Sequence, residues 1–176
     1  MFTATQSGTN LAVQLCYYRG LHEFRASPWL TNSETLLAHM NEVSCSGGPT
    51  QIARLLTHYR NAGSATTPVR GLVFVGDACE EAPSTLIDLA GQCRLLNQPL
   101  FMFQEGLDLS TANLFKEMAA VSGGAYAPFD DSSAAYLGEL LGAVARYATG
   151  GRLALSRSGR DSDKLLLAQL PDSKSS

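Results

Sequence analysis

The sequence predicts an α/β fold, with a mostly parallel sheet, helices on both faces and one antiparallel hairpin at an edge. Apolar runs of strand length alternate with helical patterns from about residue 44 to residue 148, as in βαβ units. Before them, two strand-like segments, 11–19 and 23–27, flank a short turn at Gly20, which indicates a hairpin. The 176 residues are enough to bury one sizeable core.

Local patterns in the first third of the chain support this arrangement. The segment 11–19 is rich in residues that favour strands, and Pro28 closes the second strand. Asn32 or Ser33 begins a helix with apolar residues at i, i+1, i+4, i+7 spacing: Leu36, Leu37, Met40 and Val43. A second helix over 51–61 has a similar apolar side, formed by Ile52, Leu55, Leu56 and Tyr59.

The next three elements form one βαβ unit. The segment 71–75 is a continuous apolar run, which is typical of a strand buried on both faces. Pro83 or Ser84 then begins a helix that continues to Leu96. The apolar run 100–103 is the next buried strand.

Three further elements complete the predicted sheet. A helix over 110–121 ends at Gly123 and Gly124. The short strand 125–129 follows, and Pro128 marks it as an edge strand. Ser132 or Ser133 caps a last helix, which covers 134–147.

We expect one domain over residues 1–152, incomplete at its N-terminus, followed by a loosely ordered tail over 153–176. Glycine, serine and charged residues are frequent after Thr149. The leucines at 165–167 and Leu170 predict one short strand within the tail.

Composition excludes several classes of function. Hydrophobic residues make up 45% of the chain and charged residues 16%, and the net charge is −3 with the 13 lysines and arginines scattered. A nucleic-acid surface is therefore not expected. No apolar run approaches the roughly 18 residues of a membrane span, and the start of the chain lacks a signal-peptide pattern. We expect a cytoplasmic protein with no membrane or nucleic-acid partner.

Polar residues follow the buried strand 71–75 directly. The strand ends in Gly76 and Asp77, and Glu80 and Glu81 lie just beyond. Thr50 lies upstream, after Gly48 and Pro49, at the start of a helix. Ligands of open α/β sheets bind at the carboxyl ends of the strands, where a hydroxyl and a carboxylate together suit a hard cation.

Simpler interpretations of the same residues remain open. Thr50 has the residue type and position of a helix cap, and Asp77 those of a turn or capping residue. Glu80 and Glu81 either stabilise the start of the next helix through its dipole, are simply solvated, or lie behind the ligands of a cation. Gly48 is a further candidate for a position behind the ligands. A nucleophilic Cys79 is not expected, because neighbouring carboxylates raise the pKa of a thiol.

The order of these motifs resembles the von Willebrand factor type A (vWA) domain. The resemblance rests on the hairpin 14–29, the Gly-Gly-Pro-Thr loop ending at Thr50, the strand ending at Asp77, and the segment 122–126. It covers about residues 8–152 and is strongest to a group of uncharacterised bacterial cytoplasmic vWA-domain proteins. It implies a Rossmann-like fold.

The resemblance also implies a metal-ion-dependent adhesion site. In vWA domains Mg²⁺, or Mn²⁺ or Ca²⁺, is held by an Asp-x-Ser/Thr-x-Ser loop, a later threonine and a later aspartate. Thr50 matches the threonine and Asp77 the aspartate. A partner protein would complete the coordination with an acidic side chain, and chaperone-like ATPases are the partner class that the resemblance implies.

One part of the vWA pattern is missing. Residues 1–10 contain no Asp-x-Ser/Thr-x-Ser motif and no preceding apolar strand. We therefore expect weak or absent cation binding, and interpret Met1 as an internal methionine of an N-terminally truncated chain. Otherwise the hairpin pairs directly with the strand ending at Asp77, or another chain supplies the missing strand, for example in a dimer through unpaired strand edges.

Three functions are consistent with these residues. The first is a non-enzymatic interaction module that binds its partner through the cation site. The second is a metal-assisted hydrolase acting on phosphate compounds with Asp77, Glu80 and Glu81. The third is a metal-free scaffold. Because the sequence has no P-loop, no GxGxxG and no nucleophile elbow, we favour the first.

Overall fold

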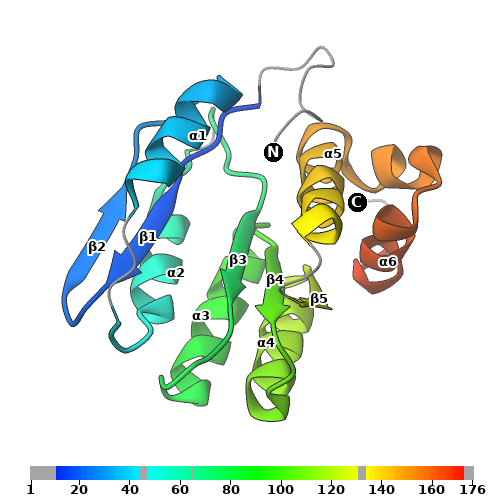
Figure 1. Cartoon of the computed structure of the whole chain (residues 1–176). Coiled ribbons are helices and arrows are strands. Elements are labelled where there is room, and N and C mark those ends of the chain that lie inside the picture. Colours follow the sequence, from blue (N-terminus) through cyan, green and yellow to red (C-terminus); the bar gives the residue numbers. More distant parts are fainter. Residues whose placement is uncertain (1–10, 44–46, 65, 131–133, 173–176) are drawn as a thin grey trace.

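The fold is α/β, as the sequence predicts, in a computed structural model that describes residues 11–43, 47–64, 66–130 and 134–172. Within these residues, six helices accompany a three-stranded parallel sheet of order β3-β4-β5 and a separate two-stranded antiparallel sheet, β1-β2 (Figure 1). The parallel sheet is therefore small. No helix in this part of the chain is long and apolar enough to cross a membrane.

The predicted hairpin is confirmed. Strands β1 (Cys16–Arg19) and β2 (Glu23–Ala26) pair antiparallel, and the turn between them contains Gly20 at φ +56°. An ion pair between Arg19 and Glu23 closes the turn, with 2.6 Å between Nε and Oε2. The hairpin forms its own sheet, so direct pairing with the strand ending at Gly76 is wrong for the described residues.

Helix α1 (Ser33–Glu42) begins where the sequence predicts. The Asn32 side chain accepts hydrogen bonds from the backbone N–H groups of Glu34 and Thr35, as expected of a capping residue. Its predicted apolar side is only partly buried. Leu36 lies in the core, whereas Leu37 and Met40 are exposed.

The central βαβ unit follows the predicted order. Helix α2 (Ile52–Asn61) leads to β3 (Leu72–Gly76), and α3 (Pro83–Leu95) connects β3 to β4 (Leu100–Glu105). Strands β3 and β4 pair in parallel, with Leu72 opposite Leu100. All four apolar residues predicted for α2 are buried.

The second crossover completes the parallel sheet. Helix α4 (Leu109–Ser122) begins at Asp108, whose carboxylate accepts the Thr111 N–H, and ends at Gly123 in the left-handed conformation. Strand β5 (Ala125–Phe129) then pairs with β4 and forms the outer strand, as Pro128 predicts. The caps predicted at Ser132 and Ser133 lie outside the described residues.

The expected loose tail is wrong for residues 153–172. Helix α5 (Ala134–Ser158) continues past the predicted end, with a break at Gly151, and α6 (Asp161–Gln169) replaces the predicted strand. Leu155, Leu166 and Leu170 are buried against the sheet. Leu166 and Leu170 are buried four positions apart, as on one side of a helix, whereas Leu165 is exposed. An apolar run this short does not by itself distinguish a helix from a strand.

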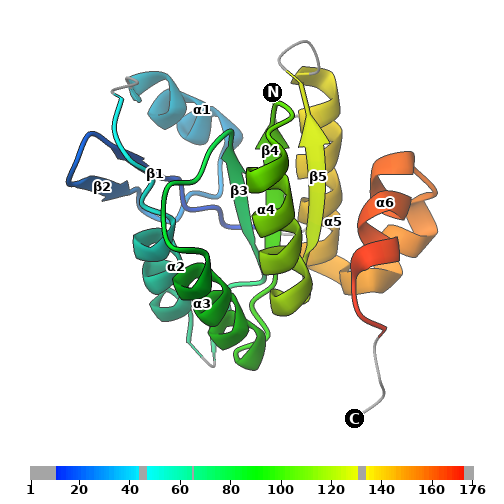
Figure 2. The ribbon, with the colours of Figure 1, turned by 90° about the horizontal axis from the view of Figure 1, so that it is seen from below.

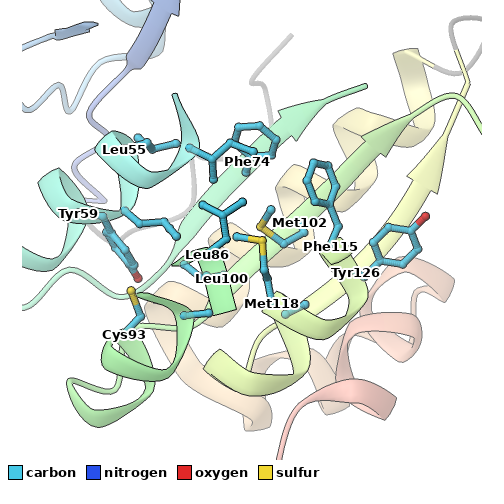
Figure 3. Packing of buried hydrophobic residues seen from close by; sticks show 14 of the residues in the cluster. Leu55, Tyr59, Phe74, Leu86, Cys93, Leu100, Met102, Phe115, Met118 and Tyr126 are labelled. Carbon is cyan, nitrogen blue, oxygen red and sulfur yellow. The ribbon is translucent and has the colours of Figure 1, made fainter. Parts of the chain in front are cut away.

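Helices cover both faces of the parallel sheet, as predicted (Figure 2). On one face Phe74, Leu100 and Met102 pack against α2, α3 and α4 (Figure 3). On the other face Phe101 and Phe103 pack against α5 and α6. Neighbouring residues of β4 thus alternate between two cores, which explains its continuous apolar sequence.

Candidate functional site at the start of helix α2

The structure brings three of the predicted site residues together. Thr50 lies immediately before α2, while Glu80 and Glu81 lie in the loop between β3 and α3. The Thr50 N–H donates to Glu80 Oε2 at 3.0 Å, and the Glu80 N–H donates to Thr50 Oγ1 at 3.3 Å. These two reciprocal hydrogen bonds join segments 30 positions apart. These contacts lower the pKa of the Glu80 carboxyl. The Thr50 N–H has the largest effect and the Thr50 hydroxyl the next largest.

Glu81 caps helix α2 from outside. Its carboxylate accepts hydrogen bonds from the backbone N–H groups of Ile52 and Ala53, the second with 3.0 Å between N and Oε2. Gln51, at the capping position itself, provides no side-chain hydrogen bond to the helix. The first N–H groups of a helix have no partner within the helix, and they carry the positive end of its dipole. The Glu81 carboxylate therefore provides hydrogen-bond acceptors for these N–H groups and a negative charge at the positive end of the dipole.

The same loop contacts the hairpin. A Cβ atom placed on Gly48 would lie 2.4 Å from the Gly20 carbonyl oxygen, so only glycine fits without a shift of the backbone. Gln51 Nε2 donates to the carbonyl oxygens of Gly20 and Glu23, each at 3.3 Å. Gly48 is therefore a packing residue between the α2 loop and the hairpin turn.

Tyr18 and Cys79 complete the surroundings of this loop. Burial, then the charge of Glu81, raises the pKa of the Tyr18 hydroxyl, and burial raises the pKa of the Cys79 thiol. Thr50 and the Glu81 backbone oppose the shift at Cys79 without cancelling it. Burial, and not the neighbouring carboxylates, is the largest cause of the raised pKa at Cys79.

Asp77 lies at the same rim but apart from these contacts. It follows β3 directly and is exposed, and no hydrogen bond or ion pair among the described residues joins it to Thr50. Mg²⁺ prefers about six oxygen ligands in octahedral geometry. The described residues contain no group of three or more His, Cys, Asp or Glu side chains that could hold a metal. At this rim, Glu80 and Glu81 accept backbone N–H groups, whereas Asp77 is exposed.

Sequence reasoning missed the partners that hold this loop in place. Gln51, Gly20 and Tyr18 have no local signal for these roles, because these contacts join residues that lie 28 or more positions apart in the sequence.

A second surface feature lies beside α2. A shallow depression is lined by Phe24 of β2 and by residues of α2 that include Arg54, Thr57 and His58. The Arg54 guanidinium lies over the Phe24 ring, 5.3 Å from its centre, and donates to the His22 carbonyl oxygen at 2.8 Å. These groups attach α2 to the hairpin.

Comparisons with protein-family models, with curated proteins and with solved structures find no match to this chain. The vWA resemblance therefore rests on the sequence motifs alone. Function has to be argued from the site.

Proposed function

We propose that this chain is a protein-interaction module with a Rossmann-like fold of the vWA type. Support comes from the order of its elements: a hairpin, a helix starting after Thr50, and a parallel strand ending at Asp77. The motif resemblance supplies the partner class, a chaperone-like ATPase, and the cytoplasmic location. Both belong to the proposal.

One observation carries the proposal: an exposed carboxylate, Asp77, lies on a rim held by its neighbours. The Thr50–Glu80 hydrogen bonds and the Glu81 cap fix the loop that follows Asp77. A rigid polar rim loses little conformational entropy when a partner binds, which favours recognition. The groups that could perform chemistry there are occupied or, like Cys79, poorly reactive.

The partner assay compares two matched carboxylates. Asp77→Asn alters the rim, whereas Asp88→Asn alters an exposed carboxylate on α3 and is the control. Proteins captured from a bacterial extract by the tagged chain are purified, and their affinity is remeasured by biolayer interferometry. We expect Asp88→Asn to bind like the parent and Asp77→Asn to bind about tenfold more weakly. Equal affinity for all three proteins would show that this rim is not the contact.

Cation binding is tested separately by calorimetry. Because the described residues provide few free oxygen ligands, we propose that Mg²⁺ binds weakly and that Mn²⁺ and Ca²⁺ do the same. The isolated chain should show no saturable heat at micromolar Mg²⁺. Sub-micromolar affinity that Asp77→Ala abolishes would instead establish the adhesion-type cation site.

The hydrolase alternative has a direct test. Glu80 and Glu81 accept backbone hydrogen bonds. Of the three carboxylates predicted for the hydrolase, only Asp77 is exposed and accepts no such bond from the described residues. We expect no release of phosphate from aryl phosphates with Mg²⁺. Activity in the parent that is lost in Asp77→Ala would favour the hydrolase.

A further inference from the structure

The two edges of the parallel sheet differ in whether their backbone groups have hydrogen-bond partners among the described residues. At the outer edge of β5, the Gln169 side chain of α6 pairs with the backbone of Tyr126. Gln169 Oε1 accepts the Tyr126 N–H at 2.9 Å, and Nε2 donates to the Tyr126 carbonyl oxygen at 2.9 Å. The amide therefore occupies the positions that another strand would use. This edge is protected against strand addition.

The opposite edge, along β3, has no such cover among the described residues. The Leu72 N–H donates to the Pro99 carbonyl oxygen at 3.1 Å, so Leu72 faces β4. Alternate residues of a strand face the same neighbour, and the backbone groups of Val73 and Val75 therefore face away from β4. No described strand pairs with them. Val75 as a whole residue is 44% exposed, which is unusual in a parallel sheet covered on both faces.

The hairpin presents a second open edge on the same side of the molecule. The Ser27 N–H donates to the Leu15 carbonyl oxygen at 2.8 Å, so the backbone groups of Cys16 and Tyr18 face away from β2. Figures 1 and 2 both show β1 on the β3 side of the parallel sheet. The side chains of Cys16 and Tyr18 pack against the same core cluster as Phe74. Within the part of the chain that the structure describes, the edges of β1 and β3 that have no paired strand thus lie on the same side of the molecule.

We propose that a single extended segment of another polypeptide adds to the β3 edge as a strand. This inference rests on the proposed interaction function and names the form of the partner. Unpaired N–H and C=O groups on β3 select a main chain in extended conformation, as in other strand-addition complexes. A second copy of this chain is not the proposed occupant, because its hairpin lies on the β3 side of its own parallel sheet, where the edge of another sheet would have to approach (Figures 1 and 2).

The surroundings also predict the side chains of this segment. On one face of β3, Phe74 belongs to the core under α2, α3 and α4, and on the other Val73 packs against the core under α5. A strand beside β3 therefore meets apolar surface with both sets of alternate residues. The partner segment should be apolar throughout, like β4.

Amide exchange tests whether the edge is open. We expect the amides of Val73 and Val75 to exchange at least about tenfold faster than those of Leu72 and Phe74, measured by NMR on the full chain. Equal protection of all four amides would mean that the edge is already covered, and would overturn the inference.

A peptide probe tests the binding itself. The probe is a labelled peptide with the sequence of residues 69–77, an apolar strand former with a charged residue near each end. Fluorescence anisotropy should detect binding to the parent and to Val75→Thr. Val75→Pro removes one N–H at the open edge without removing a bond to β4, and should weaken binding about tenfold or more. A copy of the peptide methylated on alternate backbone nitrogens should bind equally weakly.

The outcomes separate this inference from the proposed function. Failure of the probe to bind the parent, or equal binding to Val75→Pro, overturns the strand addition. If Val75→Pro does not fold by circular dichroism, Val75→Lys replaces it, since a charge at the edge also opposes pairing. A captured partner that is sensitive to Asp77→Asn but not to Val75→Pro would leave the interaction module standing and refute the strand.

Discussion

Glu81 illustrates how one side chain can serve an element distant from it in sequence. It lies two residues before α3, where an acidic residue would ordinarily be assigned to the dipole of that helix. Its carboxylate instead accepts N–H groups from the first turn of α2. Glu80 and Glu81 thus hydrogen-bond the segment that begins α2 and hold it to the loop between β3 and α3.

Replacing Glu81 should therefore destabilise the chain. Glu81→Ala leaves two N–H groups of α2 without a partner, and we expect the free energy of unfolding to fall by about 1–2 kcal/mol. Urea denaturation followed by circular dichroism measures this. Glu117→Ala, on the exposed side of α4, is the control and should change stability by less than about 0.5 kcal/mol. Equal effects of the two substitutions would contradict the capping role.

Glu80 predicts a dependence of stability on pH. Its folded pKa lies below the ordinary value of 4.5, because the Thr50 N–H and hydroxyl favour the charged form. The Glu80–Thr50 contact therefore contributes stability above pH 4.5, and this contribution is lost as the pH falls through the folded pKa. Unfolding of the parent and Glu80→Gln, measured from pH 7 down to pH 3, should show a stability difference that shrinks on acidification. A constant difference would argue against the contact.

At the scale of elements, the hairpin is attached through α2. Gln51 donates to the hairpin turn, Arg54 donates to the His22 carbonyl oxygen, and Gly48 packs against Gly20. No strand pairing contributes to this junction within the described residues. Side chains at the start of one helix thus position a separate sheet.

Two adjacent glycines give a matched test of this junction. A Cβ on Gly48 would meet the Gly20 backbone, whereas a Cβ on Gly47 would have nothing within 4 Å. We expect Gly48→Ala to lower the free energy of unfolding by about 1–3 kcal/mol, and Gly47→Ala to leave it nearly unchanged. Thermal unfolding by calorimetry distinguishes the two. If Gly48→Ala left the free energy of unfolding unchanged, the hairpin turn would be able to shift without cost, which would contradict the packing role of Gly48.

Helices α5 and α6 are joined by a buried ion pair. Asp163 is fully buried. Its carboxylate accepts hydrogen bonds from two nitrogens of the Arg146 guanidinium, at 2.8 Å from Nη2 and 3.1 Å from Nε. Removing one partner of such a pair leaves the other charge poorly compensated. Here part of the Arg146 side chain still reaches water, which moderates the cost.

Asp163→Ala should consequently destabilise the chain by about 2–3 kcal/mol. The double variant Asp163→Leu with Arg146→Met removes both charges and should be more stable than Asp163→Ala. Asp161→Ala, at an exposed aspartate in the first turn of α6, serves as the control. The measurement is guanidinium denaturation, and a double variant less stable than Asp163→Ala would contradict the argument.

At the scale of the whole molecule, the strands differ in how well their backbones are shielded by neighbouring strands and helices. Strand β4 lies between two neighbours, and its first five residues are buried between the two cores. The hairpin strands have one neighbour each and no fully buried residue. One edge of the parallel sheet is covered by α6, and the other presents unpaired backbone groups within the described residues. Such an edge is where strand addition and aggregation begin.

Native-state hydrogen exchange should follow this order. We expect the amides of β4 to exchange at least about a hundredfold more slowly than those of β1 and β2, because the hairpin opens without disrupting the parallel sheet. Exchange monitored by mass spectrometry of proteolytic fragments is sufficient to compare them. Equal protection of hairpin and β4 would indicate one cooperative unit.

The success of the sequence predictions depended on how local each signal was. The apolar spacing of α2 and the capping residue Asn32 are local patterns, and the structure has both as predicted. The prediction of a strand at the leucines of α6 was wrong because a short apolar run fits a helix and a strand equally well. At the candidate site, the sequence assigned Thr50 and Asp77 to a cation and left Glu80 and Glu81 to the dipole of α3, to solvent or to a place behind the ligands; it did not predict their hydrogen bonds to Thr50 and α2.

The sequence by itself determined the order and type of most elements, since repeating apolar positions and capping residues act within a few positions of one another. Only the tertiary structure decided what Glu80, Glu81 and Gln169 do, since their partners lie 28 to 43 positions away. It likewise decided that the hairpin is a separate sheet and that one edge of β3 has no described partner. Such pairings depend on how already formed elements pack, which no local pattern of residues encodes.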